Sequence, residues 1–432
     1  MKVALVLPAD PPGTHNFYQV PIGTLYTASR LRGQGFSPRV FDLRVRHAPG
    51  SPVYEEIADA DCVFVLPQDY ELAQCYPKLS PARRCIQSLR TAGAETIVAA
   101  GSHATVDAVA TADFLGVDGC VAGEFEFAIP DFIAELRRTG TSPARFPHSG
   151  SRLASSEELA LLGSPAFDLA PMNEYRSEGF VNGALSRVPS GLLLSNRGCP
   201  YACDFCYLFF ERKIRRRPIE HTLREVKTMW AEHGIRHFFF LDYTFTLDER
   251  WVGEMCDGLE GLGLDISWIC QSRVDRLSSE MLKHMKSAGC DGLWLGVESP
   301  DLDQRRYLGK GGIGFKEVMD GIELVRQAGI QPMAFVIVGL PAETEDSLES
   351  LNRWLDDTAV HYSLSTFTPR RGTPLGDELS SRHDGWRYLE YIDKTGHLGE
   401  SSLRSRDLEW FFNFHDAHPR RVANIVAAAG GD

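Results

Sequence analysis

Three cysteines of the 432-residue chain share one short segment: Cys199, Cys203 and Cys206 are separated by three and by two residues. Thiolates with this spacing can wrap a single loop around a cube of iron and sulfide. A structural cluster has all four irons closed by four cysteines, whereas three ligands leave one iron open. An open iron can chelate the amino and carboxylate groups of a small molecule. The triad therefore predicts a [4Fe–4S] site that takes part in chemistry.

Zinc is the alternative that these residue types allow. A zinc site would require a fourth cysteine or histidine nearby, and the nearest one downstream, His221, stands at a spacing unusual for a zinc module. The other seven cysteines are scattered through apolar segments, where small buried hydrophobic side chains are expected. They are Cys62, Cys75, Cys85, Cys120, Cys256, Cys270 and Cys290.

The triad follows a predicted strand, and strands and helical patterns alternate after it. Six such units within residues 190–375 predict a partial (β/α)₆ barrel, whose active site lies at the C-terminal ends of its strands. The expected strands are residues 191–195, 237–242, 265–271, 292–298, 333–339 and 362–366.

Residues 1–138 also alternate short apolar runs with helical patterns. This alternation predicts a Rossmann-like, doubly wound parallel sheet, so the fold class expected for the chain is α/β. Residues 139–189 have clustered Ser, Pro, Gly and Arg with little periodicity, which predicts a linker over the surface. Residues 376–432 lose the regular alternation and are expected to form a small helical cap or tail.

The cysteine segment resembles the radical S-adenosylmethionine (SAM) superfamily, whose hallmark is CxxxCxxC after the first barrel strand. Phe205 fills the aromatic position before the last cysteine of that motif. The resemblance covers about residues 189–374. It implies that the open iron binds SAM, and that reductive cleavage of SAM gives a 5′-deoxyadenosyl radical.

Further polar residues stand at later strand ends, where the resemblance implies contacts to SAM. Asp242 would accept a hydrogen bond from the SAM ammonium, although it could instead cap the helix that follows. Arg273, beside Gln271, would pair with the SAM carboxylate. Glu298 would bind the ribose hydroxyls, and Gly339 would let the adenine approach the backbone. No catalytic side chain can be named from the sequence.

The first unit resembles the cobalamin-binding domain of B12-dependent radical SAM enzymes in three motifs, at residues 21–26, 101–105 and 123–126. Two glycines of the family pattern are replaced here, by Ala100 and Phe125. A fold retained without its cofactor is the alternative. The DxHxxG loop of cobalamin mutases is absent, so no histidine from that motif can ligate the cobalt. The resemblance implies cobalamin contacts at Gly101, Ser102, His103, Ala104, Thr105, Gly123 and Glu124, with Gln68, Asp69 and Tyr70 beneath the cobalt.

The formal net charge of −13 argues against nucleic acid or an anionic membrane as partner, because both attract basic surfaces. No secretory leader and no apolar run near ~18 residues is evident, so a cytoplasmic location is expected. Residues 212–217 form a basic run that is either solvated surface or a docking patch for an electron donor such as flavodoxin with flavodoxin reductase.

By resemblance, the expected reaction is C-methylation of an unactivated carbon in a small biosynthetic, natural-product intermediate. It would proceed through the 5′-deoxyadenosyl radical and methylcobalamin. The alternative is a radical SAM oxidoreductase, rearrangement catalyst or cyclase that uses the same domains without methyl transfer. A protein that merely senses SAM or cobalamin would not need a three-thiolate loop with an open iron.

Overall fold

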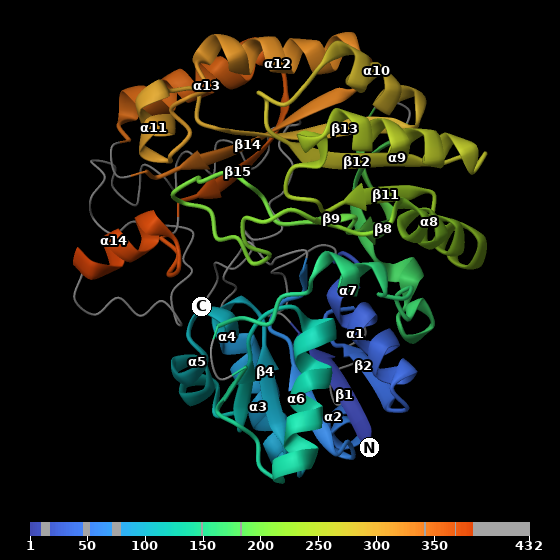
Figure 1. The fold of residues 1–432 in the computed structure, drawn as a ribbon. Helices are drawn as coiled ribbons and strands as arrows, with labels where there is room; N and C mark the ends of the chain where they lie inside the picture. Colours follow the sequence, from blue (N-terminus) through green and yellow to red (C-terminus); the bar gives the residue numbers. More distant parts are fainter. Residues whose placement is uncertain are drawn as a thin grey trace.

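The computed structural model describes residues 1–9, 18–45, 52–70, 79–147, 150–181, 184–340, 343–367 and 369–382. Two α/β units lie one above the other in Figure 1, each built on its own sheet, and the earlier part of the chain forms the lower one. The remainder of the expected C-terminal cap, from residue 383 on, lies outside the described residues.

The first unit is a parallel sheet with strand order β2-β1-β3-β4-β5-β6. The strand order reverses between β1 and β3, which is the switch point at which doubly wound sheets bind ligands. Its core strands β3 and β4 are buried at every position, as expected for parallel strands covered on both faces. The strands are β1 Lys2–Leu7, β2 Ser37–Asp42, β3 Cys62–Val65, β4 Ile97–Ala100, β5 Gly119–Val121 and β6 Arg145–Phe146.

Helices cover both faces of this sheet, which confirms the predicted doubly wound fold. Helices α1 and α6 pack against each other on one face, while α2, α3 and α5 share a separate apolar core on the other. The helices are α1 Ile22–Gly33, α2 Val53–Ala58, α3 Ser80–Thr91, α4 Ser102–Val106, α5 Ala108–Leu115 and α6 Phe125–Thr139.

The second unit has the strand order β15-β14-β13-β12-β11-β8-β7. Six neighbouring strands are parallel, and only the edge strand β7 is antiparallel. The sheet stays open, so the predicted partial (β/α)₆ barrel is confirmed. Its strands are β7 Arg176–Val181, β8 Ala184–Leu193, β11 His237–Phe240, β12 Ser267–Ser272, β13 Cys290–Glu298, β14 Gln331–Val338 and β15 His361–Thr366.

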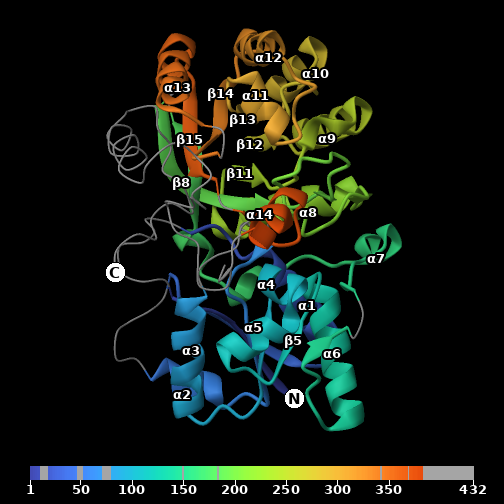
Figure 2. The ribbon, with the colours of Figure 1, turned by 90° about the vertical axis from the view of Figure 1, so that its left-hand side faces the viewer.

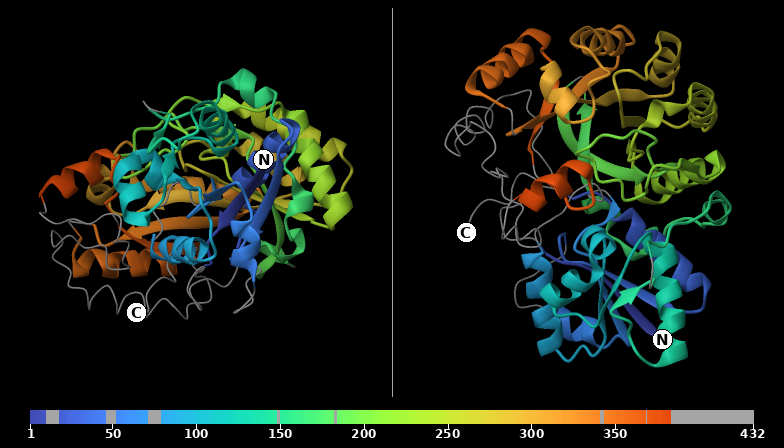
Figure 3. Two further views of the ribbon diagram at one scale, coloured as in Figure 1. Left: turned by 90° about the horizontal axis from the view of Figure 1, so that it is seen from below. Right: turned by 60° about the vertical axis from the view of Figure 1, so that its left-hand side comes forward.

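The helices of this unit form an arc outside the sheet (Figures 2 and 3). Several begin at a capping side chain that accepts the N–H three residues on: Asp248 for α9, Ser278 for α10 and Thr344 for α13. The helices are α8 Ile219–His233, α9 Glu249–Gly261, α10 Ser279–Ser287, α11 Leu302–Tyr307, α12 Phe315–Gln327 and α13 Glu345–Thr358.

The expected linker is more ordered than its composition suggested. Strand β6 joins the edge of the first sheet, and β7 joins the edge of the second. Between them lie the short helix α7 Ser156–Ala160 and two 3₁₀ turns. The segment therefore connects the two units, but it also holds regular elements that were not predicted, because strands of two to six residues at a sheet edge leave no periodic signal.

The two units share one apolar core, which includes Leu25 and Phe125 of the first unit and Leu194 and Phe210 of the second. Helix α14, Pro374–Arg382, follows β15 at the junction of the two units (Figure 2). No helix in the described part of the chain is long and apolar enough to cross a membrane.

Candidate active site

The cysteine triad lies on the loop that leaves the C-terminal edge of β8, which we call the cluster loop (residues 198–210). Two antiparallel strands of two residues each, β9 (Asn196–Arg197) and β10 (Arg215–Arg216), pair as a hairpin at the base of this loop. Gly198 has a φ of +92°, and a Cβ at this position would overlap the carbonyl oxygen of Lys213. The entry to the loop therefore requires glycine.

All three cysteines of the triad carry free thiols. Cys199 is 9% exposed, and its Sγ lies 3.8 Å from Oγ1 of Thr244. Cys203 and Cys206 are partly exposed, and the amide of Cys206 donates to the carbonyl of Cys203 at 3.2 Å. Three soft thiol donors on one loop at a sheet edge suit an iron–sulfur cluster with an open iron. His221, the residue considered for zinc, lies in the first turn of α8 next to Arg217.

Asp242 follows β11 and is fully buried. Its carboxylate accepts the Ser195 hydroxyl at 2.6 Å and the backbone N–H of Asn196. Burial raises its pKa to about 7, against the opposing effect of these hydrogen bonds. Both oxygens thus hold the chain that enters the cluster loop, and the expected contact with the SAM ammonium stays a prediction. The capping alternative is wrong, since Asp248 caps α9.

Arg273 follows β12 and lies against the cluster loop. Its Nη1 donates to Sγ of Cys203 at 3.8 Å, and its guanidinium lies 3.9 Å from the ring centre of Tyr201. Asp275 accepts from the Nε and Nη2 atoms at 2.9 and 3.1 Å. Gln271, predicted beside it, donates to the carbonyl of Leu241 at 3.2 Å.

Glu298 ends β13 with a φ of +63°, a backbone conformation that residues other than glycine rarely adopt. Its carboxylate is paired with the buried ammonium of Lys310 at 2.7 Å, and Lys310 also donates to the carbonyl of Gly296 at 3.0 Å. Burial alone would lower the pKa of Lys310, but the Glu298 carboxylate raises it above its ordinary value, so Lys310 stays charged. Its Nζ lies 6.0 Å from the ring centre of Phe205.

Lys310 was not predicted, because it belongs to none of the motifs. The one sequence signal is the glycine that precedes Lys310. In the structure Gly309 has a φ of +71°, and a Cβ at this position would be too close to Asp204. The backbone also joins these segments, since the amide of Asp204 donates to the carbonyl of Leu308 at 3.1 Å. The loop that carries Lys310 therefore packs directly on the cluster loop.

Gly339 follows β14 with a φ of +80°, and its N–H is donated to the carboxylate of Glu343. Burial raises the pKa of Glu343 to about 7. Phe205 packs on an apolar cluster that includes Leu340 and Leu375. Gly339 thus lies at the edge of the barrel where Phe205 of the cluster loop packs.

The basic run is largely internal. The Arg215 side chain is 5% exposed and that of Arg217 is 1% exposed, and each is paired with a buried carboxylate, Arg215 with Glu124 and Arg217 with Glu225. Arg212 and Lys213 are the exposed members. The expectation of a continuous solvated or docking patch was wrong for the buried arginines.

Arg197 connects the cluster loop to the first unit, in a group that we call the Arg197 hub. Its guanidinium is completely buried and pairs with Glu124 at 3.0 Å and with Glu126. Arg215 pairs with the other oxygen of Glu124 at 2.7 Å. The Tyr70 hydroxyl donates to Glu126 and accepts the N–H of Phe125. Glu124 was expected to contact cobalamin, and in the structure its carboxylate pairs with both arginines between the two units.

Two of the three residues expected beneath a cobalt have hydrogen-bond partners within the chain. The buried carboxylate of Asp69 accepts the N–H groups of Gly23 and Thr24 and so holds the start of α1. Tyr70 belongs to the Arg197 hub. Gln68 alone lines a pocket, where its amide donates to the hydroxyl of Ser102.

That pocket lies at the C-terminal ends of β3 and β4, as the sequence predicted for the first unit. It is lined by Pro67, Gln68, residues 99–104 and Thr111. Gly101 has a φ of +130°, and a Cβ there would meet only Cγ of Gln68, at 3.6 Å. The hydroxyl of Thr105 donates to the carbonyl of Gly101 and accepts the N–H of Gly123, which joins the two predicted loops.

As its side chains lie, the pocket has no room for a water molecule, so only its open backbone edge at Gly101 can meet a larger molecule. Backbone amides beside an open glycine suit the polar tail of a nucleotide-like group. The residues present therefore fit part of a cobalamin.

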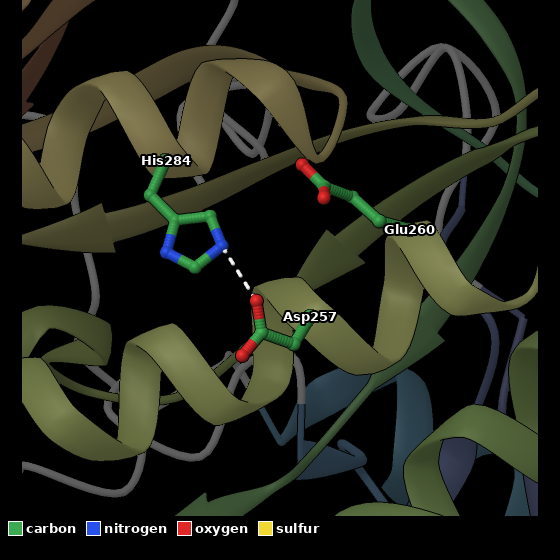
Figure 4. Close-up of side chains that lie close together, drawn as sticks. All are labelled: Asp257, Glu260 and His284. Atoms are coloured by element: carbon green, nitrogen blue, oxygen red, sulfur yellow. Dashed lines mark ion pairs between the residues drawn. The ribbon is translucent and has the colours of Figure 1, made fainter.

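A second group of metal-binding residue types lies away from this edge. Asp257 and Glu260 on α9 face His284 on α10, and Nε2 of His284 lies 3.0 Å from Oδ1 of Asp257 (Figure 4). Both carboxylates are exposed on the outer helical layer, so the group is an ordinary surface ion pair.

Comparison with known proteins agrees with this geometry. Residues 193–355 match the profile of the Radical SAM superfamily. An uncharacterized methyltransferase of Pyrococcus horikoshii is 26% identical over 91% of this chain and 87% of its own length. The hopanoid C-2 methylase of Rhodopseudomonas palustris is 23% identical over 84% of this chain and 64% of its own length.

Among solved structures, the radical SAM methyltransferase TsrM of Kitasatospora setae matches 89% of this chain and 76% of its own, with a TM-score of 0.68 and 18% identity. The cobalamin-dependent radical SAM enzyme OxsB matches 90% of this chain and 56% of its own, with a TM-score of 0.67 and 16% identity. These likenesses establish the shared two-unit fold. The chain is therefore an enzyme with a Radical SAM domain over residues 193–355, and it shares the two-unit fold of these solved structures.

Proposed function

We propose that this enzyme is a cobalamin-dependent radical SAM methylase that transfers a methyl group to an unactivated carbon of a small biosynthetic intermediate. One observation carries the proposal. Gly372 lies between the cluster loop and α4, the helix whose first turn lines the pocket, because a Cβ at Gly372 would be 3.4 Å from Val106 of α4 and 3.6 Å from Tyr207 of the cluster loop. The relatives named as methyltransferases or methylases support it.

Each bound group has residues of this chain to hold it. Cys199, Cys203 and Cys206 would ligate the cluster by three irons, and SAM would bind the fourth. Gln68 and residues 101–105 would receive the tail of cobalamin. When bound, the cluster with SAM supplies a 5′-deoxyadenosyl radical, and cobalamin supplies the methyl group.

The chain's own residues position these groups. Asp242 and the Arg197 hub fix the two sides of the segment that enters the cluster loop. The Lys310–Glu298 pair keeps both of its charges buried beside Phe205. Glu298 remains the proposed ribose contact, and Gly339 the proposed adenine contact. The electron donor is proposed to be a flavodoxin-like protein, for which Arg212 and Lys213 remain exposed.

The test separates the two cofactor sites. Anaerobically reconstituted protein is expected to hold about four irons, and after incubation with hydroxocobalamin and desalting it should retain about one cobalamin in the base-off form. Changing the three cysteines together to Ala should remove the iron. Gly101→Val should remove the cobalamin and keep the iron. Gly116→Val is the matched control, since Gly116 has a φ of +71° and open space around it.

Activity can be followed without knowing the substrate. Reduced holoenzyme supplied with SAM should form both 5′-deoxyadenosine and S-adenosylhomocysteine, and Gly101→Val should lose only the second product. Wild-type protein that retains no cobalamin, yet cleaves SAM, would contradict the methylase proposal.

A radical cyclase is the second candidate. The anaerobic magnesium-protoporphyrin IX monomethyl ester cyclase of Cereibacter sphaeroides is 31% identical over 45% of this chain and 33% of its own length. A cyclase or oxidoreductase would form 5′-deoxyadenosine without S-adenosylhomocysteine.

A further inference from the structure

On one side of the cluster loop, the Tyr201 ring stacks against the Arg273 guanidinium. Tyr201 lies between Cys199 and Cys203 in the loop, and the Arg273 guanidinium lies 3.9 Å from the centre of its ring. This distance is well within the ~6 Å range of cation–π contacts. Arg276 lies 5.4 Å from the centre of the same ring.

Arg273 is held from three directions. Its plane lies against Tyr201, its Nε and Nη2 edge is bound by Asp275, and its Nη1 donates to Sγ of Cys203 at 3.8 Å. The side chain is 13% exposed. A planar guanidinium can make these three contacts together. A lysine ammonium cannot stack on the ring and cannot bind the carboxylate through two parallel N–H groups.

We propose that Arg273 is a positioning residue for the cluster, which holds the sulfur of Cys203 through an N–H···S hydrogen bond and thereby raises the reduction potential of the cluster bound there. The one-electron reduction adds negative charge to the cluster and its thiolates. Hydrogen bonds to the sulfurs and nearby positive charge stabilise that reduced form. The proposal rests on the proposed function only in that a cluster is bound.

This role is distinct from binding the carboxylate of SAM. A guanidinium carries five N–H donors, and three of them are used by Asp275 and Cys203. The two remaining donors leave room for a carboxylate as well. Because the contact with Cys203 exists without SAM, its effect is expected in protein that contains the cluster and no SAM.

The experiment is a redox titration of the reconstituted, SAM-free protein, followed by low-temperature electron paramagnetic resonance. Loss of a hydrogen bond to a charged group corresponds to about tenfold or more in an equilibrium constant. Only the part of this free energy that differs between the two oxidation states affects the ratio, so Arg273→Met is expected to lower the ratio of reduced to oxidised cluster by up to about tenfold at a fixed potential. Arg273→Lys should lie between this variant and wild type.

Two companion variants make the result specific. Arg276→Met removes the same charge beside the same ring without touching Cys203, so the reduction equilibrium should shift by clearly less than in Arg273→Met. Asp275→Asn leaves Arg273 in place but removes the carboxylate that offsets its charge, so the shift should be in the opposite direction, toward the reduced cluster. Equal shifts in Arg273→Met and Arg276→Met, or a lowered potential in Asp275→Asn, would overturn the proposal.

Iron content and visible absorption of each variant are measured first. Wild-type protein that binds no cluster would contradict the proposed function, whereas loaded variants with unchanged potentials would contradict the role of Arg273 alone. If Arg273→Met fails to bind iron, Asp275→Asn carries the test, because it keeps every contact to the cluster loop.

Discussion

At the scale of single residues, two aspartates six positions apart experience opposite environments. Asp242 is enclosed behind the cluster loop, where burial raises its pKa to about 7. Asp248 caps α9 at the surface, where its hydrogen bond to Arg216 lowers its pKa. An unfolded chain would give both carboxyls a pKa near ~3.9. The first group therefore binds protons on folding near pH 6, and the second releases protons at lower pH.

These shifts predict a difference in how stability depends on pH. Because the folded pKa of Asp242 is raised, its protonated form favours folding below pH ~4, and that advantage is lost as the pH rises to about 7. At about 1.36 kcal/mol per pKa unit, the loss is at most about 4 kcal/mol. Asp242→Asn keeps an acceptor oxygen and removes the charge. The thermal midpoint of this variant minus that of wild type should therefore increase as the pH rises from 5 to 8.

Asp248→Asn provides the control for this measurement. Its lowered pKa contributes stability only above pH ~4, so the variant should lose a constant amount between pH 5 and 8. The two midpoint differences are measured by differential scanning fluorimetry at each pH. A flat profile for Asp242→Asn would show that the carboxyl is not protonated near neutral pH.

At the scale of elements, the cluster loop depends on the hairpin of β9 and β10 at its base. The amide of Cys199 donates to the carbonyl of Glu211 at 3.0 Å across this hairpin. Gly198 brings the two arms so close that a methyl group would overlap the carbonyl of Lys213. The hairpin therefore sets the position of the first ligand.

Gly198→Ala is expected to impair cluster binding. The positive φ alone costs a non-glycine residue about 1–2 kcal/mol, and the overlap with Lys213 adds to that cost. Gly234→Ala is the matched control, because Gly234 has a φ of +67° and open space around it at the end of α8. Iron content should fall in Gly198→Ala and stay at the wild-type level in Gly234→Ala. Equal iron content in the two variants would refute the steric argument.

Elements and motifs differ in how far the sequence reveals them. Buried strands such as β3 and β14 are continuous apolar runs, so their type and order could be predicted. β6 has only two residues, and its place at the sheet edge is fixed by pairing with β5, which no local pattern encodes. The motif residues were placed at the correct edge, but their partners were not visible. Arg197 and Glu126 are 71 positions apart, and the match between them appears only after both units have folded.

At the scale of the whole molecule, the two units are joined by charges of two kinds. The Arg197 hub is completely buried, whereas Arg371 meets Asp107 at 2.9 Å with about half of its side chain exposed. Buried charges are costly when one partner is removed, because the other remains without compensation. Exposed pairs contribute little, because water and salt screen them.

Glu126→Gln is therefore expected to lower the stability of the protein by about 3–5 kcal/mol, since it leaves Arg197 short of one charge. Arg371→Gln should cost about 0–1 kcal/mol. Thermal unfolding at low and high salt checks both values, and only the effect of Arg371→Gln should depend on salt. Similar losses in the two variants would contradict the distinction.

The Arg197 hub also limits how such an enzyme can be recombined. Two guanidiniums beside the cluster loop are paired with two carboxylates at the beginning of α6. Without the other unit, each unit would therefore keep charged groups without their partners. A chimaera that takes the barrel from this protein and the first unit from a relative must bring both acidic residues, and the tyrosine that orders one of them. The boundary at which the chain can be cut and rejoined is therefore set by charge pairing across the junction rather than by the length of the connecting segment.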